Sequence, residues 1–471
     1  MIRRAAIGSA TAASIAAAAT GILAVRTGVD LLPVLGIVAA AIVIVIAAVL
    51  AVRRYAALIL LLLVVRPELD AVGHSTASAV GLVFLGGSAW WLLSRWRHDR
   101  LLRPTPAAWG LIAFVGAASL STLGSHLPLL SAGATTRLAA GVLMFVVIEQ
   151  LVRSGTLSTR SIHLALAASA VLVCAHVAVQ VLAGSAPVDE STGLSRVTGP
   201  FVHASVLGKY AAVVTVLMLA RAVWTQTADR LLWALGAIAT SAVVLLTYTR
   251  AAWLALALGV LVLAYRRDHR WLPVIAVAGL IGFAATPSLN QRLVDVWDPP
   301  EPPPGAPASS LAWRVDYWHD LLPLGRVNPL NGIGLDVVPT VRSEGLLPHN
   351  VWVQTWIELG LLGVLVLLGV VVTTVLTLRR ASRALQHTSG ERRAALEAAL
   401  AVAVGLFVVT LSENLLDETT TLWCAAAVMA SGWSASRLPE PRDEDAAPWW
   451  LNRSGWRERR PRRGRDAASP R

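Results

Sequence analysis

Arginine, lysine and histidine side chains lie beside long apolar runs in the middle and later parts of the chain. Arg250 and Arg314 stand out, because a guanidinium stays charged and can form two parallel hydrogen bonds to an oxyanion. His349 is the candidate general base, since neutral imidazole can accept a proton near pH 7. A single arginine at the end of a span is more often an anchor that reaches the interface, so these residues carry weight only together.

His349 stands directly before Asn350, which can cap the helix predicted from residue 351. A helix N-terminus disfavours the imidazolium form and attracts anions, so this position suits both a neutral base and a bound anion. A solvated interfacial histidine is the alternative interpretation. Glu358 lies about two turns into the same run, where a carboxylate is costly unless paired. We expect Arg250 as its partner.

Apolar helices must position these residues. The chain has 471 residues, of which 56% are hydrophobic and 14% charged, too apolar for a soluble protein of this length. A bilayer span needs about 20 apolar residues and must be helical. We therefore predict an all-α polytopic integral membrane protein with about 14 transmembrane helices (12–14) and one large extracytoplasmic loop. The predicted spans are residues 5–25, 31–52, 55–66, 77–94, 107–123, 134–152, 160–184, 203–222, 230–248, 250–265, 271–287, 351–378, 394–412 and 418–436. A signal peptide is the alternative for the first.

Arginine sets the predicted orientation. Basic residues fill alternate loops, and the opposite loops are poor in them, as the positive-inside rule requires of a protein with both termini in the cytoplasm. The expected location is the inner or plasma membrane, with the loop 288–350 and the active site outside. The net charge of +12 follows from this topology, so no nucleic-acid partner is implied. The organisation predicted is N-terminal transmembrane helices (1–185), a second membrane region (186–436) and a basic, disordered cytoplasmic tail (437–471).

The outer loop combines a proline-rich spacer with a short helix. Ser309 or Ser310 can begin a helix that Pro323 limits. The side chains of Trp313, Tyr317 and Leu321 share one face of it, which predicts an amphipathic helix lying on the membrane surface. A turn-rich stretch, Asn328-Pro-Leu-Asn-Gly-Ile-Gly-Leu335, follows.

Five stretches, in this order, resemble the superfamily of O-antigen ligases and Wzy-type polysaccharide polymerases. They are Thr247-Tyr-Thr-Arg-Ala-Ala-Trp253, Trp313-Arg314 before Asn328–Gly334, His349-Asn350, and Glu358-Leu-Gly-Leu-Leu-Gly363. Gly199-Pro-Phe-Val-His-Ala204 is loosely similar to an upstream motif. The resemblance covers about 190–365. Thr249 departs from it, because serine is more usual before this arginine.

The resemblance implies a membrane glycosyltransferase that moves a glycan from a polyprenyl diphosphate carrier to an acceptor hydroxyl, as a ligase or a polymerase. Its partners would be the lipid-linked donor, a glycan or lipid-glycan acceptor, and the bilayer. It implies catalytic roles for His349, Arg314 and Arg250, with the arginines as diphosphate ligands. Arg196, Lys209, Asn350 and Glu358 would bind substrate. No cofactor or metal is expected, since the predicted outer loops lack paired carboxylates of the Asp-x-Asp type.

Weaker candidates and two other functions stay open. His203 and His319 are weaker candidates for the base, and the acidic loop Glu413–Glu418 either holds acceptor sugar or is simply hydrated. A transporter or flippase of lipid-linked glycan is the main alternative. It should carry charged residues at mid-span and broken helices. A non-catalytic membrane scaffold is the third possibility.

Overall fold

A computed structural model describes residues 54–72, 74–98, 100–188, 195–226, 228–270, 272–274, 277, 310–341, 345–384 and 390–437. The predicted spans 5–25 and 31–52, almost all of 271–287, the proline-rich spacer and the basic tail lie outside these residues. All helices described below belong to one unit of the chain, Met1–Ser436.

Every regular element in the described residues is helical, which confirms the all-α prediction. The helices are α3 (Tyr55–Val72), α4 (His74–Arg97), α5 (Pro106–Leu123), α6 (Pro128–Arg153), α7 (Thr159–Leu182), α8 (Ala204–Trp224), α9 (Arg230–Leu246), α10 (Arg250–Arg267), α13 (Ser310–Leu321), η1 (Leu322–Arg326), α14 (Val338–Val341), α15 (Val351–Ala384), α16 (Glu391–Thr410) and α17 (Thr419–Ala435). Six of the described helices, α5 to α8, α15 and α16, are long and apolar enough to cross a membrane. These helices are consistent with a polytopic membrane protein, while the count of fourteen spans stays a prediction.

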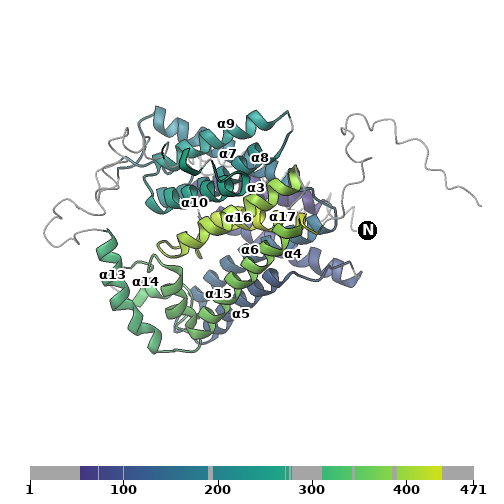
Figure 1. Cartoon of the computed structure of the whole chain (residues 1–471). Helices are drawn as coiled ribbons and strands as arrows, with labels where there is room; N and C mark the ends of the chain where they lie inside the picture. Colours follow the sequence, from purple (N-terminus) through teal and green to yellow (C-terminus); the bar gives the residue numbers. More distant parts are fainter. Residues whose placement is uncertain are drawn as a thin grey trace, which may run out of the picture. The chain divides into compact units, whose positions relative to one another are not determined.

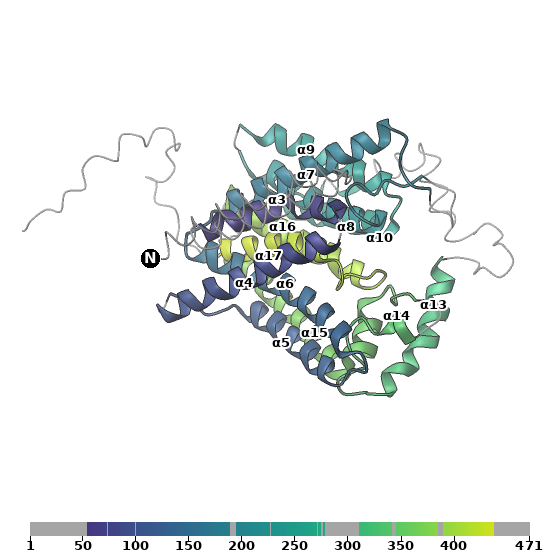
Figure 2. The same ribbon diagram turned by 180° about the vertical axis from the view of Figure 1, so that it is seen from behind.

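Helices α16 and α17 occupy the middle of the helical assembly (Figure 1). On one side α16 packs against α8 and α10, and on the other α17 packs against α6. Figure 2 shows the same arrangement from behind. The pair packs closely because Gly432 of α17 faces the backbone of Ala395, where an added Cβ would lie 2.2 Å from the carbonyl oxygen. Small residues allow this kind of close helix contact in membranes.

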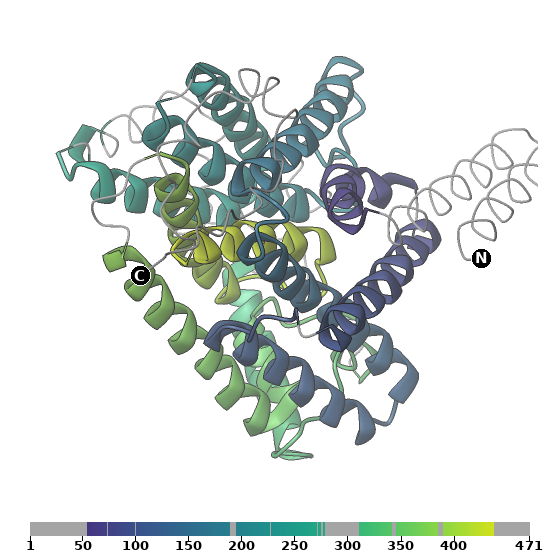
Figure 3. The ribbon, with the colours of Figure 1, turned by 90° about the vertical axis from the view of Figure 1, so that its right-hand side faces the viewer.

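Helix α15 packs alongside α5 and has little contact with α16 and α17 (Figure 3). It is kinked at Gly360, whose φ of 65° and ψ of −165° are open to glycine alone. The kink frees backbone groups, and the turn-rich stretch binds them. The amides of Leu361 and Leu362 donate to the carbonyls of Pro329 and Leu330 at 2.9 and 3.0 Å.

The same stretch also binds the carbonyls before the kink. The amides of Ile333 and Gly334 donate to the carbonyls of Ile357 and Glu358 at 3.1 and 3.0 Å. The segment Asn328–Gly334 therefore serves to satisfy the backbone of a broken helix. Such a break is tolerated at membrane depth because the freed groups are bonded within the protein.

The short helix α13 begins at Ser310 and ends before Pro323, as predicted. Its predicted apolar face exists, but Tyr317 and Leu321 are buried against Ile333, Val338 and other protein side chains. The prediction that the apolar face of this helix rests on the membrane surface is therefore wrong. The face is covered by protein, because the folded stretch after η1 supplies an apolar surface that the sequence alone does not reveal.

Candidate functional site

The predicted basic residues and His349 converge on one cavity of about 840 Å³. Arg196, Lys209, Arg250 and Arg314 all line it, although they come from four separate parts of the chain. Four carboxylates line it as well: Asp336, Glu413, Asp417 and Glu418. The cavity is therefore mixed in charge, and its chemistry depends on which charges meet one another.

Arg196 and Arg250 both lie at the turn between α9 and α10. The two helices are joined by only three residues, as the predicted spans 230–248 and 250–265 lead one to expect. The Arg196 guanidinium donates to the Thr247 carbonyl at 2.9 Å and to the Thr249 hydroxyl at 3.1 Å. Arg250 is the first residue of α10 and lines the cavity beside them. The threonine at 249 keeps the hydroxyl that a serine would supply.

Arg314 reaches from α13 to the loop between α16 and α17. Its guanidinium donates to the Ser412 carbonyl at 2.7 Å and to a carboxylate oxygen of Glu413 at 3.2 Å. The residue is half-buried, which leaves part of its planar fork facing the cavity. A charge-assisted hydrogen bond thus links α13 to the loop between α16 and α17.

The environment of Lys209 differs from that of the arginines, because Lys209 is fully buried and paired with carboxylates. Its side chain is 1% exposed and forms ion pairs with Glu413, at 3.4 Å, and with Glu418. It also donates to the Asn414 carbonyl at 3.0 Å. With its charge met by two carboxylates, Lys209 serves to hold the α16–α17 loop. Its predicted role in binding diphosphate stays a prediction, and the sequence could not show a counterion 204 residues away.

His349 lies where the sequence predicted, just before α15. The Asn350 side-chain oxygen accepts hydrogen bonds from the amides of Trp352 and Val353 at 2.9 and 3.1 Å, so Asn350 is the expected cap. His349 itself has a φ of 51°, an unusual backbone conformation for this residue type. Strain of this kind collects at functional sites and persists only where neighbours enforce it.

Two neighbours hold the imidazole of His349. The Asn414 side chain contacts both its backbone amide, at 2.8 Å, and its ring Nδ1, at 3.4 Å. The Trp313 indole lies edge-on to the ring, with centroids 6.0 Å apart. Burial lowers the pKa of His349, and the positive charges of Arg314 and Lys209 lower it further against the opposing effect of Glu413 and Asp417.

Asn350 and Glu358 do not line the cavity, whereas both were expected to bind substrate. Glu358 is fully buried, and the expectation that Arg250 pairs with it is wrong. Its carboxylate instead accepts from the Val338 amide at 3.1 Å and from the Gln354 side chain at 2.9 Å. Backbone donors of a folded loop take the place of the predicted arginine.

Two residues of the site, Asn414 and Asp336, received no role from the sequence. Asp417 was considered only with Glu413 and Glu418, as part of an acidic loop that either holds acceptor sugar or is hydrated. All three residues, Asn414, Asp336 and Asp417, line the cavity. The polar run between two apolar helices was the available signal for Asn414 and Asp417. Of the weaker histidines, His203 lines the cavity and His319 lies exposed on α13 outside it.

Metal-ligand geometry is absent from the described residues, where no group of three or more His, Cys, Asp or Glu side chains could hold an ion. Metal-independent chemistry stays a prediction. Within the described part of the chain, the arginines are the groups suited to meet a concentrated negative charge.

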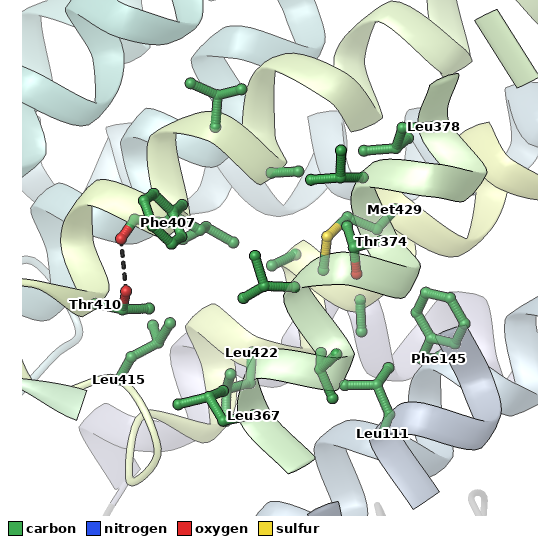
Figure 4. Close-up of a pocket in the computed structure, with 18 of the residues that line it drawn as sticks. Leu111, Phe145, Leu367, Thr374, Leu378, Phe407, Thr410, Leu415, Leu422 and Met429 are labelled. Atoms are coloured by element: carbon green, nitrogen blue, oxygen red, sulfur yellow. Dashed lines mark hydrogen bonds between the residues drawn. The ribbon is translucent and has the colours of Figure 1, made fainter. Parts of the chain in front are cut away.

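A second cavity, of about 820 Å³, is lined mainly by apolar side chains. Figure 4 shows its lining from α5 and α6 (Leu111, Phe145), α15 (Leu367, Thr374, Leu378) and α16 and α17 (Phe407, Leu422, Met429). Val351 and Trp352 line this cavity two and three residues after His349 of the polar one. Arg379 and Arg383 lie at its far end.

Comparison with known families gives a match in the middle and later part of the chain. A family model of the O-antigen ligases matches residues 235–368. The chain is O-antigen ligase-like over this region. The matched residues run from α9 to just past the α15 kink and include Arg250, Arg314 and His349, while Arg196, Lys209 and Asn414 lie outside them. No curated protein matches the chain.

Proposed function

We propose that this O-antigen ligase-like protein is a membrane glycosyltransferase that moves a glycan from a polyprenyl diphosphate to an acceptor hydroxyl. The family match supports the ligase or polymerase class. The identity of the donor, the identity of the acceptor and the roles of individual residues are what we propose. The observation that carries it is that an arginine-lined cavity and an apolar cavity both reach the start of α15, where His349 lines the first and Val351 lines the second.

The arginines match the anionic part of such a donor. Arg250 and Arg314 line one cavity with His349, and α15 begins beside them with its N-terminus capped by Asn350. A helix start and guanidinium groups both favour an oxyanion, so we assign the diphosphate to this place. Arg196 reinforces it by holding the α9–α10 turn from which Arg250 projects.

The apolar cavity matches the lipid part. A polyprenyl chain bound there would bury its hydrocarbon against leucine, valine and phenylalanine side chains. Its diphosphate would then emerge at Val351, next to His349. In this pose the glycosidic carbon attached to the diphosphate lies in the polar cavity, where Asp336 and Asp417 can hydrogen-bond acceptor hydroxyls.

In the reaction, the acceptor oxygen forms a bond to the anomeric carbon as the bond from that carbon to the diphosphate oxygen breaks. The electron pair leaves with the diphosphate, and the acceptor hydroxyl loses its proton. Preorganised donors that face the leaving oxygen stabilise the charge that develops there. Arg250, Arg314 and His349 are the groups that we assign to this part of the cavity.

Deletion of the gene in its host tests the proposal. We expect surface glycan to be lost while the lipid-linked glycan accumulates on the outer face of the membrane. Accumulation on the cytoplasmic face would instead favour the flippase. Complementation with Arg250→Ala should fail, whereas Arg326→Ala, an exposed arginine on η1 outside the cavity, should restore the glycan.

A further inference from the structure

We infer that Asn414 holds the His349 imidazole as its Nε2–H tautomer, so that His349 presents a hydrogen-bond donor to the reacting groups and is not the base. This inference rests on the proposed function for its catalytic meaning. Its structural part, the position of one proton, stands independently of any activity. The sequence-based hypothesis of a His349 base would require that proton on the other ring nitrogen.

The orientation of the Asn414 amide is fixed by the backbone. The His349 amide N–H can only donate, and it lies 2.8 Å from Oδ1 of Asn414. Oδ1 therefore faces the backbone, and Nδ2 faces the ring. The two ends of an asparagine amide are often ambiguous, but here the fixed backbone donor resolves them.

The tautomer follows from that orientation. Nδ2 of Asn414 only donates, and it lies 3.4 Å from the His349 Nδ1. A proton on Nδ1 would set two donors against each other. Neutral imidazole carries one proton, so it resides on Nε2. A base acting through Nε2 would need an acceptor at Nδ1, and the residue that contacts it is a donor.

Asn414 is itself held firmly. Its backbone carbonyl accepts a hydrogen bond from the buried Lys209 at 3.0 Å, and its neighbour Glu413 is fastened by Lys209 and Arg314. The left-handed backbone at His349 keeps the residue at its position before the Asn350 cap. These contacts make Asn414 a positioning residue, whose effect on the substrate passes through the His349 ring.

A neutral donor suits the leaving group. Nε2–H can donate to the diphosphate oxygen as the bond to the anomeric carbon breaks and charge develops on that oxygen. The acceptor's proton passes to an oxygen of the departing diphosphate, so the products are the new glycoside and a protonated diphosphate. All atoms and charges then balance without a protein base. A helix N-terminus favours neutral imidazole as an electrophile in the same way.

The charged groups that influence His349 come from three elements. Arg314 of α13 and Lys209 of α8 disfavour its protonation, and Glu413 and Asp417 of the α16–α17 loop favour it. Because imidazolium retains Nε2–H, protonation alone does not remove the donor. A base, by contrast, would fail when protonated. The two roles therefore predict opposite responses to pH once the tautomer is altered.

The first experiment observes the proton. Nitrogen NMR of ¹⁵N-histidine-labelled protein in nanodiscs, with the His349 signals assigned by their absence in His349→Gln, reports which nitrogen carries it. We expect protonated Nε2 and bare Nδ1 in the wild type. In Asn414→Asp, which keeps an acceptor for the backbone amide, the proton should move to Nδ1. A wild-type proton on Nδ1 would overturn the inference whether or not glycan transfer is detected.

The second experiment tests the role of His349 in glycan transfer. In Asn414→Asp we expect transfer to fall as the pH rises, because the deprotonated ring then has no proton on Nε2. Transfer that rises with pH, or does not respond to it, would show that His349 is not the donor. In otherwise wild-type protein, His349→Gln keeps a side-chain N–H and should stay within about tenfold, while His349→Ala should lose roughly 10²–10³-fold. Equal losses in both would also contradict the donor role.

Discussion

Arg314 of α13 and Glu413 of the α16–α17 loop form an ion pair at 3.2 Å across 99 residues of sequence. The same carboxylate lies 3.4 Å from the ammonium group of Lys209. These two cations hold the pKa of Glu413 below its usual value despite its burial. The loop that carries Asn414 is therefore fixed by charges, and the His349 ring is fixed by that loop.

Replacing Arg314 or Arg250 by lysine should impair turnover, because the charge remains but the planar fork is lost. Loss of one charge-assisted bond should cost roughly 1.5–3 kcal/mol in the transition state, or about ten- to a hundredfold in rate. Initial rates with purified lipid-linked donor measure the effect. Arg326→Lys is the matched control and should keep full activity. Unchanged rates in Arg314→Lys would remove Arg314 from the set of diphosphate ligands.

Lys209→Met should destabilise the protein, because it leaves two carboxylates buried without their shared cation. Loss of one partner of a buried pair costs roughly 3–5 kcal/mol. Thermal unfolding in detergent should show a lower midpoint, and Lys209→Met with Glu418→Gln should recover part of it by removing one stranded charge. If Lys209 instead bound diphosphate, the single variant would keep its stability and lose only turnover.

The kink of α15 should tolerate no side chain. A Cβ on Gly360 would lie 2.6 Å from the backbone of Leu330, in a conformation that other residues rarely adopt. Gly360→Ala should therefore lower the unfolding midpoint in detergent markedly. Gly369→Ala lies on the same helix with open space around its Cβ, and it should leave stability unchanged or slightly raised. Equal behaviour of the two variants would show that the inserted loop is not essential.

The sequence sufficed to predict the all-helical class and the convergence of Arg250, Arg314 and His349. Each of these residues stands at the start of a helix or in the outer loop, on one predicted side of the membrane, so topology alone brings them near one another. The cap by Asn350 was also predictable, because it depends on residues two and three positions away.

Longer-range pairings were beyond sequence reasoning. The partner of Lys209 lies 204 residues away, and the partners of Glu358 include a backbone amide of a folded loop. The prediction for α13 identified the apolar face but not what covers it, because lipid and protein offer similar surfaces to tryptophan and tyrosine. Asn414 was overlooked because its role depends on the orientation of one side-chain amide beside His349.

The predicted topology can be tested at two exposed arginines. Arg326 lies on η1, and Arg380 lies near the far end of α15 from His349. In a protein without Cys174 and Cys424, Arg326→Cys should react with an impermeant thiol reagent in intact cells. Arg380→Cys should react only after permeabilisation. The reverse pattern would place the polar cavity on the cytoplasmic side and contradict the proposed direction of assembly.

In the proposed reaction, this protein breaks the bond between a glycan and its polyprenyl diphosphate. The most direct test uses purified protein in proteoliposomes with a lipid extract that contains both the host's lipid-linked glycan and its acceptor. We predict release of free polyprenyl diphosphate in equal amount to the glycan gained by the acceptor, with both lost in His349→Ala. Movement of intact lipid-linked glycan between leaflets, with no diphosphate released, would contradict this account and establish a flippase.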